Sequence, residues 1–413
     1  MRILATFALL LAGACSGGEG SPNGVPAPGT PSPPPHAPAQ LLVMLENPDE
    51  QDDIDDLAAE FGLVGVERIG QTAFFFVEIS AATDLDELLK ELDDDGRVIV
   101  SELDYLAESP EGGPTDVAVT GSDILLSIPT QPALANLDLT AAHAVTTGGG
   151  IVVAVVDTGL DPTQPFLAGQ IEPGGFDFLD QDGDPTDERN FLDDDGDGVA
   201  DEQFGHGTFV ASMILAVAPD ARILPVRSLD AEGFGTASTV AAGIVWAADM
   251  GAAVICVSVD IPDASKVVKE AIGYAEDQDV LIVAAAGNSG ANDLVFPARF
   301  GDVVGVAAVD ATGVVAPFSN VGSKTSLVAP GVELIGAVPL TMNPPGTARW
   351  SGTSFAAPLV AGSAALVRSA MPALDRGEVA QRLRDTAAPV DALNPAHVGR
   401  LGAGLVQPAA ALR

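Results

Sequence analysis

The sequence predicts an α/β protein in which helices cover a parallel sheet, preceded by a small α+β domain. Two observations lead to this prediction. From residue 131 onward, continuous apolar runs alternate with helical segments, and strands that are apolar at nearly every position are buried on both faces of a sheet. Between residues 41 and 108, short strand-like and helix-like patterns alternate, which is typical of a ferredoxin-like β-α-β-β-α-β unit.

The parallel sheet is predicted from five apolar runs, at 151–156, 223–226, 253–259, 281–286 and 303–309. Sites in such sheets form at the carboxyl ends of the strands. Asp157 follows the first run and Asn288 follows the fourth, so both side chains are expected at that edge.

The small unit is predicted from strands at 41–45, 72–79 and 98–100 and from helices at 52–61 and 85–92. Residues 15–40, ahead of it, are nearly all Gly, Pro, Ser and Ala. Such a segment cannot bury a core, and we interpret it as a semi-extended tether.

The chain begins with the features of an export signal. Met1 and Arg2 precede a short apolar run, and small residues then lead to Cys15. The run is too short to remain as a membrane-spanning helix, so residues 1–14 are predicted to be a signal peptide. Cleavage before Cys15 fits an ordinary signal and also a bacterial lipoprotein signal, which would attach lipid to Cys15 as a membrane tether. Both outcomes, an extracellular protein and a lipoprotein anchored at the outer membrane, remain open.

Charge and cysteine content exclude several classes of function. The 413 residues include 58 acids and 18 bases, a formal net charge of -40, so nucleic acid and anionic lipid surfaces are excluded as partners. Cys15 and Cys256 provide no internal disulfide framework. Stability must therefore come from a packed core or from bound metal.

Three short motifs carry an acid, an imidazole and a hydroxyl in that order. Asp157 lies in Val-Val-Asp-Thr-Gly, His206 in Gly-His-Gly-Thr, and Ser354 in Ser-Gly-Thr-Ser-Phe-Ala-Ala-Pro. A serine hydroxyl needs a nearby base, and that base needs a buried acid to fix its tautomer and orientation. The order Asp, His, Ser is one of the few in which folds assemble a nucleophilic triad.

An oxyanion site is predicted beside the serine. His206 and Ser354 are expected to open helices at 208–217 and 355–371, and a helix start at Ser354 points free backbone N–H groups at the developing negative charge. Asn288, just past a strand, is the expected side-chain donor and the fourth catalytic residue.

With these motifs in order, residues 131–413 resemble the subtilisin-like serine proteases. The resemblance implies that family's fold and a serine endopeptidase that cleaves polypeptides through an acyl-enzyme. From its position, the unit at 41–108 resembles the inhibitory propeptides of the same family. The resemblance therefore implies a precursor in which this prodomain inhibits the enzyme until the linker 109–130 is cleaved.

The resemblance also predicts a substrate cleft. Gly233 and Gly235 suit pairing with an extended peptide by strand addition, and Ser258 lies on the opposing strand. The family usually has Ser-Leu-Gly at the segment that ends here at Asp260, so we expect one wall to be crowded or charged. No acid lies in residues 284–287, the stretch expected to line the substrate pocket and to end at Gly287. This favours an apolar substrate residue before the scissile bond.

Other departures from the family are Phe209, Ser212 and Leu359, where it usually has His, Gly and His. All three are predicted to lie on the packed sides of helices and to leave the triad intact.

The acidic segment between Asp157 and His206 is a candidate calcium site. It contains two acidic clusters, the first at 180–184 and the second at 193–201. The second cluster matches positions one, three, five, six and nine of a calcium loop, but position twelve is Phe204 in place of Glu. A solvated acidic loop is the alternative interpretation. The candidate ligands are the carboxylates of Asp180, Asp182, Asp184, Asp193, Asp195, Asp197 and Asp201.

Two functions of different classes remain open from the sequence. The first is an exported or lipid-anchored serine endopeptidase. The second is a catalytically silent calcium-binding surface protein on the same scaffold. Completeness of the triad favours the first.

Overall fold

The computed structural model places most of the chain, and the fold is described for those residues alone. The predicted signal peptide, Cys15, most of the tether, Asp195 and Asp197 lie outside them. The described residues are 36–46, 51–68, 74–80, 83–110, 117–118, 127–193, 198–261, 263–344 and 346–413.

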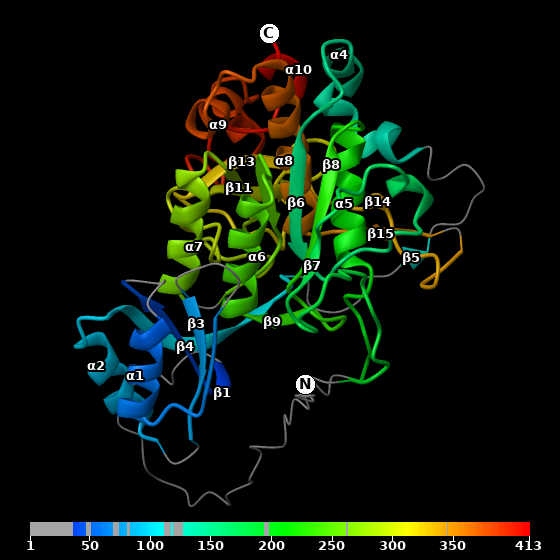
Figure 1. Ribbon diagram of the computed structural model, residues 1–413. Helices are drawn as coiled ribbons and strands as arrows, with labels where there is room; N and C mark the ends of the chain where they lie inside the picture. The colour runs from blue at the N-terminus through cyan, green and yellow to red at the C-terminus, as the bar shows by residue number, and fades with distance from the viewer. Residues whose placement is uncertain are drawn as a thin grey trace, which may run out of the picture.

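A large parallel sheet forms the centre of the molecule (Figure 1). Its order is β13-β12-β11-β10-β6-β8-β7, and every neighbouring pair is parallel. All five predicted runs are strands of this sheet, which confirms the predicted fold class. The strands are β6 (Val152–Asp157), β7 (Phe176–Asp177), β8 (Arg222–Arg227), β10 (Val254–Val257), β11 (Leu281–Ala285), β12 (Val304–Val309) and β13 (Thr325–Pro330).

Helices cover this sheet and bury its apolar strands (Figure 1). Helix α5 (His206–Val217) packs against α8 (Thr353–Ala370), and α6 (Ala237–Asp249) packs against α7 (Lys266–Asp277). Among the described helices, none combines the length and the apolar character needed to cross a bilayer. The shorter helices are α4 (Leu139–His143), α9 (Arg376–Asp385), α10 (Pro408–Ala411) and the 3-10 turns at 128–130, 132–137, 165–167 and 391–393.

The three departures from the family pattern are packed as predicted. Phe209, Ser212 and Leu359 are fully buried on α5 and α8. Ser212 Oγ donates to the Phe209 carbonyl at 2.7 Å and accepts from the Ala337 N–H at 3.0 Å, so its polar group is satisfied in the core.

The small N-terminal unit has the predicted order β-α-β-β-α-β and its own apolar core. β1 begins at His36, five residues before the predicted start of this strand at residue 41, because its first residue pairs with Tyr105. β2 was missed by sequence analysis because its four residues include only one aliphatic side chain. The elements are β1 (His36–Leu45), α1 (Gln51–Phe61), β2 (Gly65–Arg68), β3 (Phe74–Glu78), α2 (Leu85–Asp93) and β4 (Val98–Glu108).

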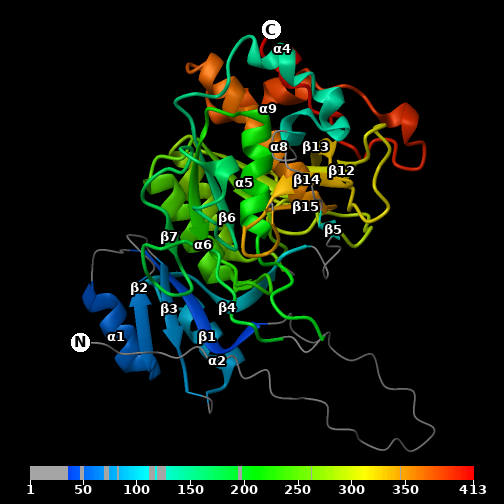
Figure 2. The ribbon, with the colours of Figure 1, turned by 90° about the vertical axis from the view of Figure 1, so that its right-hand side faces the viewer.

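Strand β4 joins the small unit to the rest of the molecule. It runs from the small unit toward the large sheet (Figure 2) and extends to Glu108, well past the predicted end at residue 100. Its last residues pair antiparallel with β9 (Phe234–Thr236), which is labelled in Figure 1. The resulting sheet has the order β2-β3-β1-β4-β9. A third sheet contains β14 (Leu334–Ala337), β15 (Thr347–Trp350) and β5 (Val117–Ala118).

Candidate active site

The predicted acid and imidazole meet at the carboxyl end of β6. Asp157 is the last residue of β6, and His206 is the first residue of α5. His206 Nδ1 lies 2.7 Å from Asp157 Oδ1, and the Thr158 N–H donates to the same oxygen at 2.8 Å. Both side chains are fully buried. A carboxylate at this position favours a proton on Nδ1, and in the neutral ring that tautomer leaves Nε2 as the basic nitrogen.

Gly205 allows α5 to begin at this point. It caps the helix with φ 94°, in the left-handed region that glycine adopts without strain. A Cβ added there would lie 2.6 Å from Pro339 Cδ, so the close approach also requires glycine.

Aromatic rings shield the imidazole. The Phe355 ring centroid lies 5.2 Å from that of His206, and the Trp350 ring stacks at 6.4 Å. Phe209 in turn stacks on Trp350 at 4.9 Å. Exclusion of water by these rings lowers the local dielectric and strengthens the Asp157–His206 hydrogen bond.

Ser354 and Asn288 lie together where β11 ends and α8 begins. Ser354 is the second residue of α8 and is fully buried. Asn288 Oδ1 accepts the Thr353 N–H at 2.9 Å, and Thr353 Oγ1 accepts the Gly287 N–H at 3.0 Å. Ser258 Oγ donates to the Ser354 carbonyl at 3.3 Å. The fold thus brings residues predicted from four separate segments to the same edge of the sheet.

The predicted substrate cleft holds a strand of the same chain. On one side, Ala107 pairs with Gly235 in β9, and the Ser109 N–H donates to the Gly233 carbonyl at 2.8 Å. Gly233 and Gly235 therefore pair with an extended segment of the same chain, in the manner of strand addition.

On the other side of that segment lies Asp260. Its N–H donates to the Glu108 carbonyl at 2.7 Å, and the Glu108 N–H donates to the Asp260 carbonyl at 2.9 Å. Residues 107–109 are thus the central strand between two walls.

Two buried carboxylates of β4 cap helices that neighbour the cleft. Asp104 accepts the Ser238 N–H at 2.9 Å and the Ser238 hydroxyl at 2.8 Å, in the first turn of α6. Glu102 accepts the Lys266 and Val267 N–H groups at 2.7 and 3.1 Å, at the start of α7. Negative charge is favourable at both helix ends. Burial nevertheless raises the pKa of Asp104 to about 6 and also raises the pKa of Glu102.

Sequence analysis missed Asp187, which links the acid and the imidazole loops. Its Oδ2 accepts the Thr158 hydroxyl at 2.9 Å and the Gly205 N–H at 2.6 Å. Burial raises the pKa of Asp187 to about 7. Asp187 belongs to the acidic segment, so its sequence context pointed to calcium and gave no sign of this role.

The first acidic cluster is occupied by protein contacts. Asp180 Oδ2 lies 3.1 Å from Arg227 Nη1. Asp182 accepts the Asp184 N–H at 2.8 Å, and Asp184 accepts the Thr186 hydroxyl at 2.6 Å. Within the part of the chain that the structure describes, no three His, Cys, Asp or Glu side chains converge as metal ligands. These contacts do not fit a cation site at the first cluster.

The second cluster is described only at its ends. Asp193 accepts the Gly198 N–H at 3.0 Å, and Asp201 accepts the Asn190 and Phe191 N–H groups at 3.0 and 3.1 Å. Asp195 and Asp197 lie outside the described residues. The two described carboxylates of this cluster, Asp193 and Asp201, thus each accept backbone N–H groups of neighbouring loop residues.

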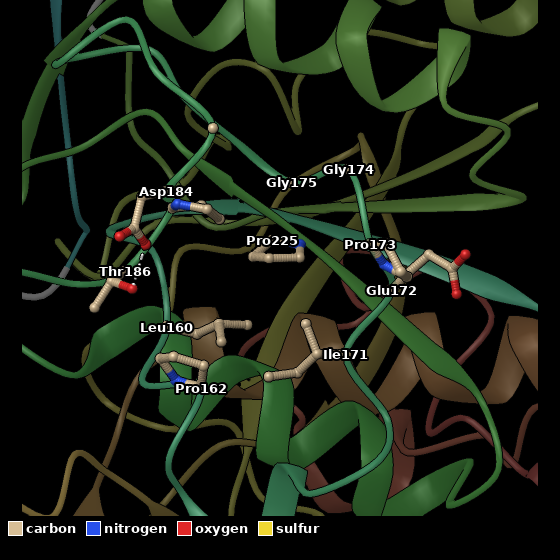
Figure 3. A pocket seen from close by; sticks show the side chains of 12 residues that line it. Leu160, Pro162, Ile171, Glu172, Pro173, Gly174, Gly175, Asp184, Thr186 and Pro225 are labelled. Carbon is tan, nitrogen blue, oxygen red and sulfur yellow. Dashed lines mark hydrogen bonds between the residues drawn. The ribbon is translucent and has the colours of Figure 1, made fainter.

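A separate cavity of about 200 Å³ lies on the surface beside β8 (Figure 3). Its lining is largely proline, glycine and aliphatic and includes Leu160, Ile171 and Pro225. None of the triad residues lines it, so it is distinct from the candidate active site.

Comparison with known proteins agrees with this geometry. The model of the subtilase family matches residues 148–404. The thermophilic serine proteinase of Bacillus sp. strain AK1 is 42% identical over 229 residues, which are 55% of each chain. Subtilisin BL of Lederbergia lenta is 36% identical over 276 residues, 65% of this chain and 92% of the relative. The chain thus spans about half the length of the first relative and nearly all of the second.

A solved structure shares the fold over most of the chain. Fervidolysin from Fervidobacterium pennivorans, described as a keratinolytic enzyme related to subtilisin, superposes with a TM-score of 0.71 at 24% identity. The match covers 91% of this chain and 61% of fervidolysin.

The fold and the site define a subtilisin-like serine protease scaffold, as the motifs predicted. The chain belongs to the subtilase family.

The contacts of β4 predict that its packing weakens as pH rises. Burial raises the pKa of Asp104 to about 6 and, together with the charge of Glu108, raises that of Asp260 to about 7, from an ordinary 3.8. The packed state therefore binds more protons than the separated state. Its stability is greatest in acid and is lost as pH rises through these values.

Hydrogen exchange on the full chain measures this effect. After correction for intrinsic rates, protection of β4 amides is expected to fall by about tenfold or more between pH 5 and pH 8, the equivalent of one pKa unit. Protection of β11 amides serves as the internal control. Unchanged or rising β4 protection would contradict the prediction.

Proposed function

We propose that this chain is a serine endopeptidase in which Asp157, His206 and Ser354 form the catalytic triad. The observation that carries the proposal is the buried 2.7 Å contact between His206 and Asp157 at the same sheet edge as Ser354 and Asn288. A relative named as a serine proteinase and another named as a subtilisin support it.

In the proposed reaction, Ser354 Oγ attacks the carbonyl carbon of an extended polypeptide. His206 Nε2 takes the hydroxyl proton and then delivers it to the leaving amine, and Asp157 stabilises the imidazolium. Water then attacks the acyl-enzyme, and His206 takes the water proton and returns it to Ser354 Oγ as the acid product leaves. The rings of Phe355 and Trp350 exclude other water from His206.

Two kinds of donor would stabilise the oxyanion. One is a backbone N–H at the start of α8, where the helix dipole is positive. The other is the Asn288 side-chain amide, whose oxygen is held by the Thr353 N–H. That hydrogen bond orients the amide before the reaction begins, so no reorganisation is needed when charge develops.

We propose that residues 41–108 are an inhibitory prodomain and that the linker 109–130 contains the processing site. Support comes from the backbone pairing of Ala107 with Gly235 and of Glu108 with Asp260, which is how a substrate strand would bind. Because residues 107–109 lie between the two segments expected to flank a substrate, cleavage is proposed near the start of the linker.

Export is proposed from residues 1–14, with Cys15 as a lipid attachment site in the anchored alternative. Mass spectrometry of the secreted or membrane fraction distinguishes the two, because diacylation adds a defined mass to a mature N-terminal cysteine.

Self-processing tests the catalytic proposal. Wild-type precursor should shorten during purification and hydrolyse peptides, whereas Ser354→Ala should stay full length, with turnover lower by about a million-fold, the loss measured for the equivalent change in a subtilisin. Ser351→Ala, three residues earlier, is the matched control and should process like wild type. A wild type that stays intact and unreactive would favour the calcium-binding, catalytically silent alternative.

The oxyanion role of Asn288 predicts a selective loss of turnover. Asn288→Ala should lower kcat by roughly a hundred- to a thousand-fold, the range known for a subtilisin, with KM little changed, because the oxyanion exists only in the transition state. The exposed Asn292→Ala is the control and should be neutral. Equal losses in both variants, or a change confined to KM, would rule out this role.

We also propose that Ca²⁺ binds the second acidic cluster and stabilises the fold there. Asp193, Asp195, Asp197 and Asp201 would supply the oxygen ligands, and the ion would offset their mutual repulsion. Thermal melts of inactive Ser354→Ala precursor should shift upward with Ca²⁺ and downward with chelator, and Asp195→Asn should reduce the shift. A melt indifferent to both additions would refute calcium binding.

A further inference from the structure

One wall of the cleft carries a carboxyl group directly opposite a bound side chain. Asp260 and Glu108 exchange both backbone hydrogen bonds, at 2.9 and 2.7 Å. In such an antiparallel pair the two Cα atoms lie about 5.5 Å apart and the two side chains leave the same face of the strands. Any residue that replaces Glu108 in the cleft will therefore present its side chain to Asp260.

The Asp260 carboxylate has no counter-charge within the described protein. It is half-buried, and among the described residues it forms no ion pair and accepts no hydrogen bond. Burial, with the charge of Glu108, raises the pKa of Asp260 to about 7. An anion in this position gains most from a cation supplied by the ligand, because partial desolvation strengthens the attraction.

Glu108, the residue that pairs with Asp260 in the structure, carries the same charge as Asp260. Glu108 places a second carboxylate opposite Asp260, and like charges directly opposite in adjacent strands are destabilising. The pairing of β4 thus relies on backbone hydrogen bonds and on the helix caps made by Glu102 and Asp104. A peptide that carries a cation at the same position would have both backbone pairing and charge complementarity.

We infer that Asp260 is a specificity-determining residue that selects Lys or Arg, and rejects Asp or Glu, at the substrate position that pairs with it. The inference rests on the proposed peptidase function and names its substrate class: polypeptides with a basic residue on the amino-terminal side of the scissile bond. Because Glu108 repels Asp260, the prodomain strand is a ligand that basic substrates displace.

Cleavage profiling tests the selection. The processed enzyme digests a peptide library, and residue frequencies are counted at each position before the cut. Wild type should show enrichment of Lys and Arg at one position, on the order of tenfold over Asp and Glu. Asp260→Asn and Asp260→Gly should abolish it, and Asp385→Asn, an equal charge change on the exposed face of α9, should preserve it. Cleavage without this enrichment, or enrichment that persists in Asp260→Asn, would overturn the inference.

A second measurement does not depend on catalysis. In the full-length Ser354→Ala chain, Glu108→Lys should increase the hydrogen-exchange protection of β4 at pH 8, and the gain should disappear when Asp260→Asn is added. Protection that rises equally with and without Asp260, or does not rise, would overturn the inference. If no peptide is hydrolysed but the gain from Glu108→Lys still depends on Asp260, the proposed function is refuted and Asp260 remains a charge-selective binding residue.

Discussion

The hydrogen bond between Asp157 and His206 is the constraint on which the rest of the structure depends. It requires a carboxylate at the end of a strand that is apolar on both faces, and a helix that begins at the imidazole itself. A buried ion or hydrogen-bonded pair is stable only when its geometry is well supported. The parallel sheet fixes Asp157, Gly205 allows α5 to start at His206, and the aromatic rings keep water away.

Asp187 ties both partners of that bond to one carboxylate. It accepts from Thr158, next to Asp157, and from Gly205, next to His206. The same pattern recurs at the cleft, where Glu102 and Asp104 each hold the start of a helix. Asp187, Glu102 and Asp104 thus each have specific structural partners in this strongly acidic chain. Burial of Glu102 and Asp104 predicts that the association of β4 with α6 and α7 is sensitive to pH.

Much of the fold follows from local sequence, but several site features do not. The five buried strands have strong local patterns, and so do the motifs around Asp157, His206 and Ser354. The structure places these three residues at one edge of the sheet. β2 is too short and too polar to show a period, and the length of β4 depends on pairing with β9, more than 120 residues later. The role of Asp187 likewise depends on contacts with distant segments, so its identity alone carried no signal. The first acidic cluster matched calcium chemistry in sequence, whereas Arg227, from another strand, pairs with Asp180.

Catalysis by Ser354 is tested by mapping the adduct of a fluorophosphonate probe by mass spectrometry of the processed protein. A single adduct is expected on the peptide that contains Ser354, and none when His206 is replaced by alanine, because the hydroxyl then lacks its base. An adduct on another serine, or peptide hydrolysis with Ser354 unmodified and the probe in excess, would contradict catalysis by Ser354.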